Sequence, residues 1–176
     1  MNNIDDKIKT LISQKVLEER IEKLADEISR DYAGMDLHMI CVLKGGVMFM
    51  TELSKHIKGC HVSMDFMSVS SYGNEQTSSG KIRIIKDLDE SIEGRHVLVV
   101  EDIIDSGKTL SHLLEVLKVR NPASLKLCTM LDKPSRREVD VDVDYVAFQI
   151  EDKFVLGYGL DYEQYYRNIP YIAFVE

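Results

Sequence analysis

The chain has 176 residues, 44% hydrophobic and 30% charged, so it carries enough apolar side chains to bury a full core. Its 22 lysine and arginine residues stand against 30 aspartate and glutamate residues, giving a formal charge of −8. Because neutralising the phosphates of a nucleic-acid duplex needs a basic face, this charge argues against duplex nucleic acid as a partner. The apolar runs are shorter than the ~20 residues that cross a bilayer, and we see no secretory leader. We therefore expect one domain over residues 1–176, in the cytoplasm and away from membranes.

The cysteines argue against a disulfide framework or a zinc site. Cys41, Cys60 and Cys128 are odd in number and lack the paired spacing of metal ligands. We expect all three to be reduced, with Cys41 and Cys128 serving as small hydrophobic residues in strands.

The first third of the chain predicts a helix, a strand and a second helix. Apolar residues recur at helical spacing over 16–28, after Ser13 as N-cap, and the pattern stops at Gly34. The run LHMICVL (37–43) is almost wholly apolar, as in a strand buried on both faces, and a helical pattern follows at 47–57.

The rest of the chain repeats this alternation. Strands are expected at 61–69 and 81–86, flanking a polar loop at 70–80 that is long enough for a lid. A buried strand at 96–102 precedes a helix through Leu110 and Leu117. Further strands are expected at 125–131, 144–150 and 171–176. Strands that alternate with helices predict an α/β fold with a mainly parallel, twisted sheet flanked by helices.

The segment VVEDIIDSGKT (99–109) concentrates the chemistry. It places Glu101, Asp102 and Asp105 directly after a buried strand, and Ser106 to Thr109 at the start of a helix. A Ser-Gly turn at a helix N-terminus favours a phosphate dianion, and ligands of open α/β sheets bind beyond the carboxyl ends of strands. Acidic residues beside a phosphate would grip sugar hydroxyls or a divalent cation. The loop therefore predicts a site for a sugar phosphate with Mg²⁺.

Two other interpretations of this loop are weaker. Gly107-Lys108-Thr109 matches the end of a nucleotide-triphosphate P-loop, but that motif needs glycine at position 102, where this chain has aspartate. The loop could also be a plain solvated turn with a capping serine, although three acids in five residues argue against this.

The chain resembles the phosphoribosyltransferases, because VVEDIIDSGKT matches their signature for 5-phosphoribosyl 1-diphosphate (PRPP). It looks specifically like the bacterial hypoxanthine-guanine enzymes, since further segments occur in the family's order: VLKGG (42–46), SSYGNEQTSSG (70–80), LDKPSRR (131–137), EDKFVLGYGLDY (151–162) and YRNIPYI (166–172). The resemblance implies the type I phosphoribosyltransferase fold with a small hood, formed by N-terminal residues and about 151–176.

The resemblance also assigns roles around PRPP. Glu101 and Asp102 would hold the ribose hydroxyls or their Mg²⁺, and Asp161 would complete the metal site or lie beside the purine. Asp105 would be the catalytic acid-base group at the purine. The 5′-phosphate would be bound by Ser106, Gly107, Lys108 and Thr109. Pyrophosphate would be bound by Lys44, Gly45 and Arg167, with a cis peptide at Leu43–Lys44.

Purine binding is implied for Lys133, which would donate to the 6-oxo group, and for Phe154 and Val155, which would give a stacking face and a backbone partner. Ser71 and Tyr72 would lie on a lid that excludes water from the reacting sugar. The implied reaction is Mg²⁺-dependent transfer of the phosphoribosyl group from PRPP to hypoxanthine and guanine, giving IMP or GMP and pyrophosphate in purine salvage. The resemblance further implies a homodimer or homotetramer.

Two other classes of function stay open. A PRPP-sensing, RNA-binding regulator of the same fold would keep the acidic loop, but the charge of −8 and the intact purine segments argue against it. A small-molecule kinase with a P-loop is the other, distinguished by whether ATP or PRPP protects the chain from heat.

Overall fold

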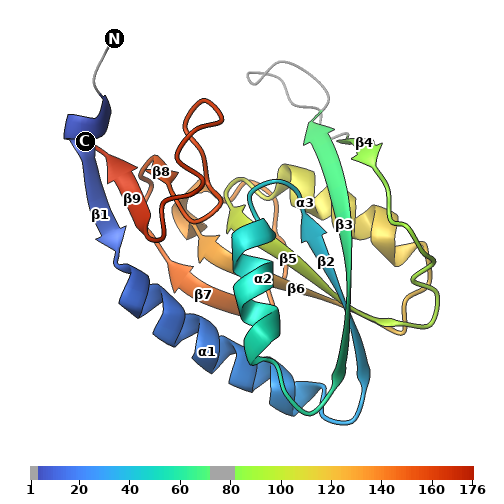
Figure 1. The fold of residues 1–176 in the computed structure, drawn as a ribbon. Helices are drawn as coiled ribbons and strands as arrows, with labels where there is room; N and C mark the ends of the chain where they lie inside the picture. The colour runs from blue at the N-terminus through green and yellow to red at the C-terminus, as the bar shows by residue number, and fades with distance from the viewer. Residues whose placement is uncertain (1–3, 72–81) are drawn as a thin grey trace.

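The structure, a computed structural model, describes residues 4–71 and 82–176 and is built on a six-stranded sheet (Figure 1). The strand order is β4-β3-β2-β5-β6-β7. Only the β3–β4 pair is antiparallel among these neighbours, which confirms the predicted mainly parallel α/β sheet. The strands are β2 (Asp36–Val42), β3 (His61–Ser71), β4 (Ile82–Lys86), β5 (His96–Ile104), β6 (Ser124–Asp132) and β7 (Tyr145–Gln149).

Among the described residues, three α-helices cover the two faces of this sheet. Helices α1 (Gln14–Asp31) and α2 (Val47–His56) lie on one face, and α3 (Lys108–Lys118) lies on the other. Short 3₁₀ turns occur at Ile4–Lys7 and Pro134–Arg136. The three helices match the predicted ones closely.

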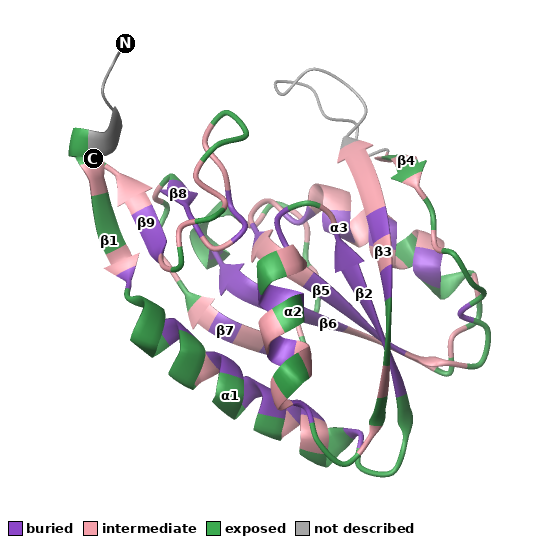
Figure 2. Cartoon of the chain, in the orientation of Figure 1, coloured by how far each residue is buried: buried purple, intermediate pink, exposed green. Residues whose placement is uncertain are grey.

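Helix α1 shows how the pattern of apolar residues sets the packing. Ser13 caps its start, because the Ser13 side chain accepts from the Val16 amide at 3.4 Å. One stripe of the helix is fully buried, and the outward stripe is exposed (Figure 2). The buried stripe consists of Leu17, Ile21, Leu24, Ala25 and Ile28.

The central strands divide their side chains between two cores. On β2, Met39 and Cys41 face α1 and α2, while Ile40 and Val42 face α3. Alternate residues of a strand point to opposite faces, so a strand covered on both sides reads as one apolar run. Cys128 of β6 is also fully buried, and the structure places both strand cysteines as small core residues.

A second, smaller sheet forms beside the carboxyl edge of β7. It joins β1 (Ile8–Ile12), β9 (Ile172–Val175) and β8 (Val155–Leu156) in antiparallel order β1-β9-β8, with β9 in the middle (Figure 1). We predicted β9 but neither of its partners. The β1 sequence IKTLI has two adjacent polar residues among its five, and β8 has only two residues, so neither shows a usable hydrophobic period.

In the part of the chain that the structure describes, no helix is both long enough and apolar enough to cross a bilayer.

Candidate active site

Three loops meet at one edge of the large sheet. Strands β2, β5 and β6 are parallel neighbours, so their carboxyl ends lie together. The loops that follow them begin at Leu43, Asp105 and Lys133. This is the edge at which open α/β sheets bind ligands, and it carries most of the residues singled out from the sequence.

Glu101 and Asp102 lie inside β5, within the strand predicted at 96–102, but the strand runs on to Ile104, so the two acids do not directly follow it. The pairing of Ile103 and Ile104 with β6 extends the strand past the acids. Burial, followed by the charge of Asp102, raises the pKa of Glu101 well above its usual value. Burial also raises the pKa of Asp102, while the Arg167 cation acts in the opposite direction.

These two neighbouring carboxyls fit a divalent cation. Mg²⁺ binds oxygen ligands and commonly takes one or two carboxylates together with substrate phosphates. A cation here would offset the repulsion that makes the doubly ionised pair unfavourable.

The turn after β5 forms an anion cradle at the start of α3. Gly107 is the residue before the helix and has a φ of 82°, a left-handed conformation that favours glycine. A Cβ there would lie 2.7 Å from the Val139 carbonyl oxygen. Asp105, Ser106, Gly107 and Thr109 line a cavity of about 230 Å³ beside the turn. The Lys108 side chain instead pairs with Glu138, so it does not reach over the loop as a P-loop lysine would.

Asp105 is held from two sides by arginines that the sequence analysis did not single out. Arg136 Nε donates to Asp105 Oδ1 at 3.2 Å, and Arg137 Nη1 donates to the Asp105 carbonyl oxygen at 2.9 Å. Arg137 also binds Asp132, a buried residue at the end of β6. The sequence signal for this contact is the adjacent pair of arginines after Pro134 in LDKPSRR (131–137). We interpreted that segment only as part of the family resemblance and assigned no role to the arginines.

The turn after β2 contains the expected cis peptide at Leu43–Lys44. Gly45 follows it in a space that admits no side chain. A Cβ on Gly45 would lie 1.5 Å from Asp102 Oδ2, and a Cβ on Gly159 would lie 2.1 Å from the Gly45 carbonyl oxygen. Gly45 is therefore packed between β5 and the segment after β8.

The segment after β8 carries the other cation expected at pyrophosphate. Arg167 Nη1 donates to the Gly159 carbonyl oxygen at 2.6 Å, and Nη2 lies 2.7 Å from Asp161 Oδ1. Lys44 and Arg167 both donate to Gln164 Oε1, at 3.1 and 3.4 Å. The structure thus brings the two cations together, and Gln164, which the sequence analysis missed, lies between them.

The predicted purine residues have contrasting surroundings. Lys133 directly follows β6 and is only 7% exposed, with its Nζ 3.6 Å from Asp152 Oδ1. Phe154 is 55% exposed, and its ring meets that of Tyr162 edge to face at 5.6 Å between centroids. Val155 is buried in β8 against Phe174 of β9. A buried lysine and an exposed aromatic ring are both unusual for plain structural roles.

Some predicted groupings are not observed. Within residues 4–71 and 82–176, no three His, Cys, Asp or Glu side chains gather to hold a metal, so Asp161 does not form one cluster with Glu101 and Asp102. Asp161 instead pairs with Arg167. Ser71 ends β3, and Tyr72 with most of the expected lid lies outside the described residues.

Comparison with protein families matches residues 8–163 to the phosphoribosyl transferase domain. The chain belongs to the phosphoribosyltransferase family. The matched range includes the acidic segment at 99–109, Gly45 and Gly159, and the segment after β8 as far as Glu163.

Proteins named as phosphoribosyltransferases resemble the chain over nearly its whole length. The hypoxanthine-guanine phosphoribosyltransferase of Bacillus subtilis is 50% identical over 165 residues, covering 94% of this chain and 91% of that protein. The Listeria monocytogenes protein named "Bifunctional protein TilS/HprT" is 51% identical over 168 residues, covering 96% of this chain. This chain spans only 26% of that longer protein.

Solved phosphoribosyltransferase structures share the fold. A crystal structure of a Bacillus anthracis hypoxanthine-guanine phosphoribosyltransferase superposes with a TM-score of 0.92 at 49% identity, covering 96% of this chain and 98% of that one. A Staphylococcus aureus hypoxanthine phosphoribosyltransferase gives 0.94 at 42% identity, covering 100% and 96%. This similarity confirms the type I phosphoribosyltransferase fold predicted from the sequence.

Proposed function

We propose that the chain transfers the 5-phosphoribosyl group of PRPP to hypoxanthine and guanine, releasing pyrophosphate and forming IMP or GMP in purine salvage. The observation that carries the proposal is the carboxyl end of β5, where two partly buried acids precede a phosphate cradle at the start of α3. Family membership and the names of the relatives support it. We further propose cytoplasmic residence and a homodimer or homotetramer.

PRPP would lie along the carboxyl edge of β5. The amides of Ser106 to Thr109 would bind its 5′-phosphate at the positive end of α3. Glu101 and Asp102 would hold the ribose hydroxyls, directly or through Mg²⁺, with Asp161 near the purine edge. When bound, Mg²⁺ would offset the negative charge of the diphosphate and help it to leave.

Pyrophosphate would leave toward Lys44, Gly45 and Arg167. In the protein without substrate, Gln164 Oε1 accepts from both Lys44 and Arg167, which keeps the two cations together. Phosphate oxygens would replace the glutamine oxygen between them, and placing donors before the reaction lowers its barrier. The small sheet β1-β9-β8 and the segment after β8 would be the hood, and Ser71 and Tyr72 would belong to the lid.

The purine would lie between Lys133 and Phe154. The Lys133 ammonium would donate to the 6-oxo group, Phe154 would stack on the ring, and Val155 would offer its backbone. As the bond from the ribose C1 to pyrophosphate breaks, a purine nitrogen forms the new bond, and Asp105 accepts the proton that this nitrogen loses. Arg136, at 3.2 Å, holds the Asp105 carboxylate in place.

A direct test incubates the protein with PRPP and Mg²⁺ and, separately, with hypoxanthine, guanine, xanthine, adenine or uracil. We expect products from hypoxanthine and guanine, and no turnover in excess EDTA. Turnover with adenine or uracil alone, or unchanged turnover in EDTA, would contradict the proposal. Thermal protection by ATP but not by PRPP would indicate a kinase instead.

A further inference from the structure

Strands β5 and β6 separate just beyond their last paired residues. Ile104 pairs with Asp132 at the end of the ladder, and the Lys133 amide still donates to the Ile104 carbonyl oxygen at 3.0 Å. The next residue after β5 is Asp105, which begins the loop to α3. The proposed acid-base group therefore lies where the backbone ladder stops, and strand pairing alone does not fix its place.

The Arg137 guanidinium joins the two chains beyond this point. Its Nη1 donates to the Asp105 carbonyl oxygen at 2.9 Å, and its Nη2 pairs with Asp132 Oδ1. The planar fork of an arginine fixes the directions of both bonds. The side chains of Arg137 and Asp132 are 17% and 9% exposed, so solvent screens this ion pair less than a surface pair.

Asp132 is itself anchored in the sheet. Its carbonyl oxygen accepts from the Ile150 amide at 2.8 Å, and its Oδ2 accepts from Gln149 Nε2 of β7 at 3.5 Å. Arg137 therefore connects the loop after β5 to a fixed point at the end of β6.

The chain around Arg137 also supports the phosphate cradle. The amides of the two residues after Arg137 donate to the Ser106 carbonyl oxygen at 3.0 and 3.1 Å. A Cβ on Gly107 would lie 3.2 Å from Arg137 Cδ. The guanidinium of Arg137 thus holds Asp105, while its carbon stem lies beside the cradle. One side chain contacts both the residue proposed to take the proton and the turn proposed to bind the 5′-phosphate.

We propose that Arg137 is a positioning residue for Asp105, an inference that rests on the proposed transfer reaction. From its anchor on Asp132, Arg137 fixes the loop so that the Asp105 carboxylate meets the purine nitrogen when the phosphate of PRPP lies in the cradle. A misplacement of about 1 Å can cost about a hundredfold in rate, so an arginine that acts through the Asp105 backbone can control the reaction.

The test is a double-mutant cycle between Arg137→Gln and Asp105→Asn, with PRPP and hypoxanthine as substrates. Glutamine keeps the carbons of the stem as far as Cδ, which lie beside Gly107, but lacks the guanidinium. We expect the single-turnover rate of Arg137→Gln to fall about tenfold to a hundredfold, and its PRPP affinity, measured by calorimetry, to stay within about threefold of the parent's. A single turnover is followed because product release limits many maximal rates.

The second half of the cycle separates positioning from a structural role. In the Asp105→Asn background, Arg137→Gln should cost less than about threefold in rate, because no proton acceptor remains to be positioned. An undiminished cost there would overturn the proposal, as would a loss of PRPP affinity equal to the loss of rate. A parent that converts neither hypoxanthine nor guanine would overturn the proposed function and this inference with it. Normal rates in both the parent and Arg137→Gln would overturn this inference alone.

Arg20 of α1 provides a matched control at the β7 edge of the sheet. It donates to the carbonyl oxygens of Val146 and Ala147 at 2.7 and 3.0 Å and pairs with Glu27 at 3.0 Å. Like Arg137, it is partly buried and joins backbone carbonyls to a carboxylate. Arg20→Gln should lower the free energy of unfolding and leave the rate unchanged. Equal losses of rate in the two glutamine variants would mean that lowered stability explains both, and would overturn the proposal.

Arg137→Lys keeps the proposal testable if Arg137→Gln does not fold. Lysine keeps a cation beside Asp132, so the buried carboxylate is not left unpaired, but it lacks the planar fork. The single-turnover rate of Arg137→Lys should still fall, and the fall should again shrink in the Asp105→Asn background. A fall of the same size in that background would overturn the proposal.

Discussion

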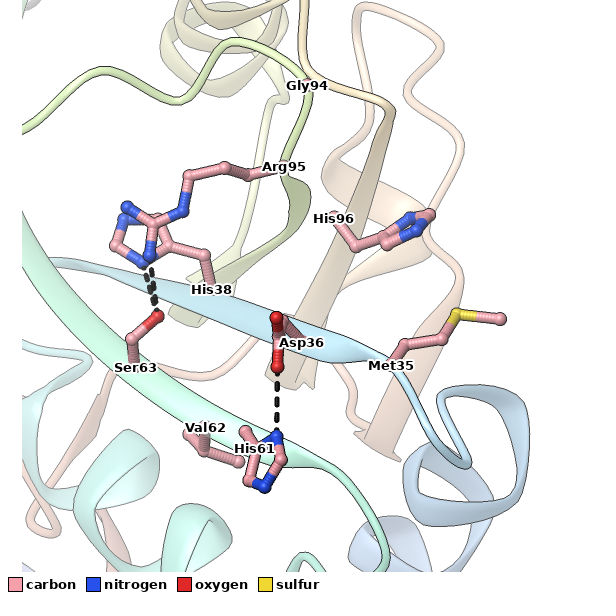
Figure 3. Close-up of a pocket in the computed structure, with 9 residues that line it drawn as sticks. All are labelled: Met35, Asp36, His38, His61, Val62, Ser63, Gly94, Arg95 and His96. Carbon is pink, nitrogen blue, oxygen red and sulfur yellow. Dashed lines mark hydrogen bonds and ion pairs between the residues drawn. The ribbon is translucent and has the colours of Figure 1, made fainter.

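The two edges of the large sheet, at the carboxyl and amino ends of its parallel strands, hold titratable groups of opposite kinds, partly buried acids at one and a buried histidine at the other. At the carboxyl edge, Glu101 and Asp102 are neighbours with raised pKa values, so ionising both is unfavourable. At the amino edge, His38 has a lowered pKa, and Ser63 connects it to Arg95. The first edge places two carboxyls side by side, whereas the second joins a histidine, a serine and an arginine by hydrogen bonds (Figure 3). The difference indicates that the carboxyl edge gives up stability for ligand binding.

The largest expected effect concerns Asp105. Asp105→Asn keeps the size of the side chain but cannot accept a proton, so the maximal rate should fall by about 10²–10⁴. Affinity for PRPP should change little, because the amides of the cradle remain. Steady-state kinetics over a range of pH measures both, and the variant's profile should lose one limb. Asp36→Asn, at the amino edge, is the control and should leave the rate unchanged. If Asp105→Asn instead weakens PRPP binding and keeps a normal rate, Asp105 binds the ligand and is not the acid-base group.

Next in size is the effect of Lys133. Lys133→Gln removes a buried cation from the proposed 6-oxo position, which should reduce kcat/KM for hypoxanthine by the equivalent of roughly 1.5–3 kcal/mol. PRPP affinity should stay near normal. Lys58→Gln, in the exposed loop before β3, is a matched control that should not alter kcat/KM. Equal losses of hypoxanthine and PRPP affinity in Lys133→Gln would place the lysine at the phosphates.

Two glycines separate backbone strain from close packing. Gly59 and Gly159 both have positive φ, but a Cβ on Gly59 meets nothing within 4 Å, while one on Gly159 meets the Gly45 carbonyl oxygen at 2.1 Å. Either alanine variant should lower the free energy of unfolding, by about 1–3 kcal/mol for the strained conformation. Only Gly159→Ala should also weaken pyrophosphate binding, measured by calorimetry. A similar loss of binding in Gly59→Ala would show that lowered stability alone explains the effect.

The smallest expected effect is on stability, and it has opposite signs at the two edges. The raised pKa of Glu101 means that the folded protein binds the Glu101 proton more tightly than the unfolded chain does. The resulting contribution to the free energy of unfolding is therefore fully present below the pKa of Glu101 in the unfolded chain, and it is lost as the pH rises through the pKa in the folded protein. His38 has the opposite dependence because its pKa is lowered. Its contribution to the free energy of unfolding is fully present above the pKa of His38 in the unfolded chain, and it is lost as the pH falls through the pKa in the folded protein.

Glu101→Gln should therefore raise the free energy of unfolding at neutral pH, by about 1 kcal/mol, and flatten its decline toward alkaline pH. Denaturant unfolding at several pH values, without Mg²⁺, measures this. Glu115→Gln, an exposed residue of α3, should change neither. A Glu101→Gln protein that is less stable at neutral pH would show that the carboxylate is well accommodated.

The sequence predicted the large sheet well because each central strand is covered on both faces. The strands are therefore visible in the sequence as apolar runs at 37–43 and 96–102. The phosphate cradle after β5 could be predicted because a glycine follows a group of acidic residues at the start of a helix. The small sheet was predicted only in part, since β1 and β8 are set by pairing with β9 and not by their own pattern. The same holds within the candidate site. Arg137 and Gln164 act through partners far away in the sequence, which no local pattern reveals.

The contact between Gly45 and Gly159 also limits how such proteins can be recombined. The segment after β8 cannot be exchanged as an independent module. Its Gly159 packs against the Gly45 carbonyl oxygen, in a turn more than a hundred positions earlier in the chain, and Gly45 itself leaves room for the Asp102 carboxylate. A chimera that grafts another base-recognition segment onto this sheet should work only when the donor brings glycine at the position of Gly159. Within libraries of such grafts, the residues at 45 and 159 should be selected together.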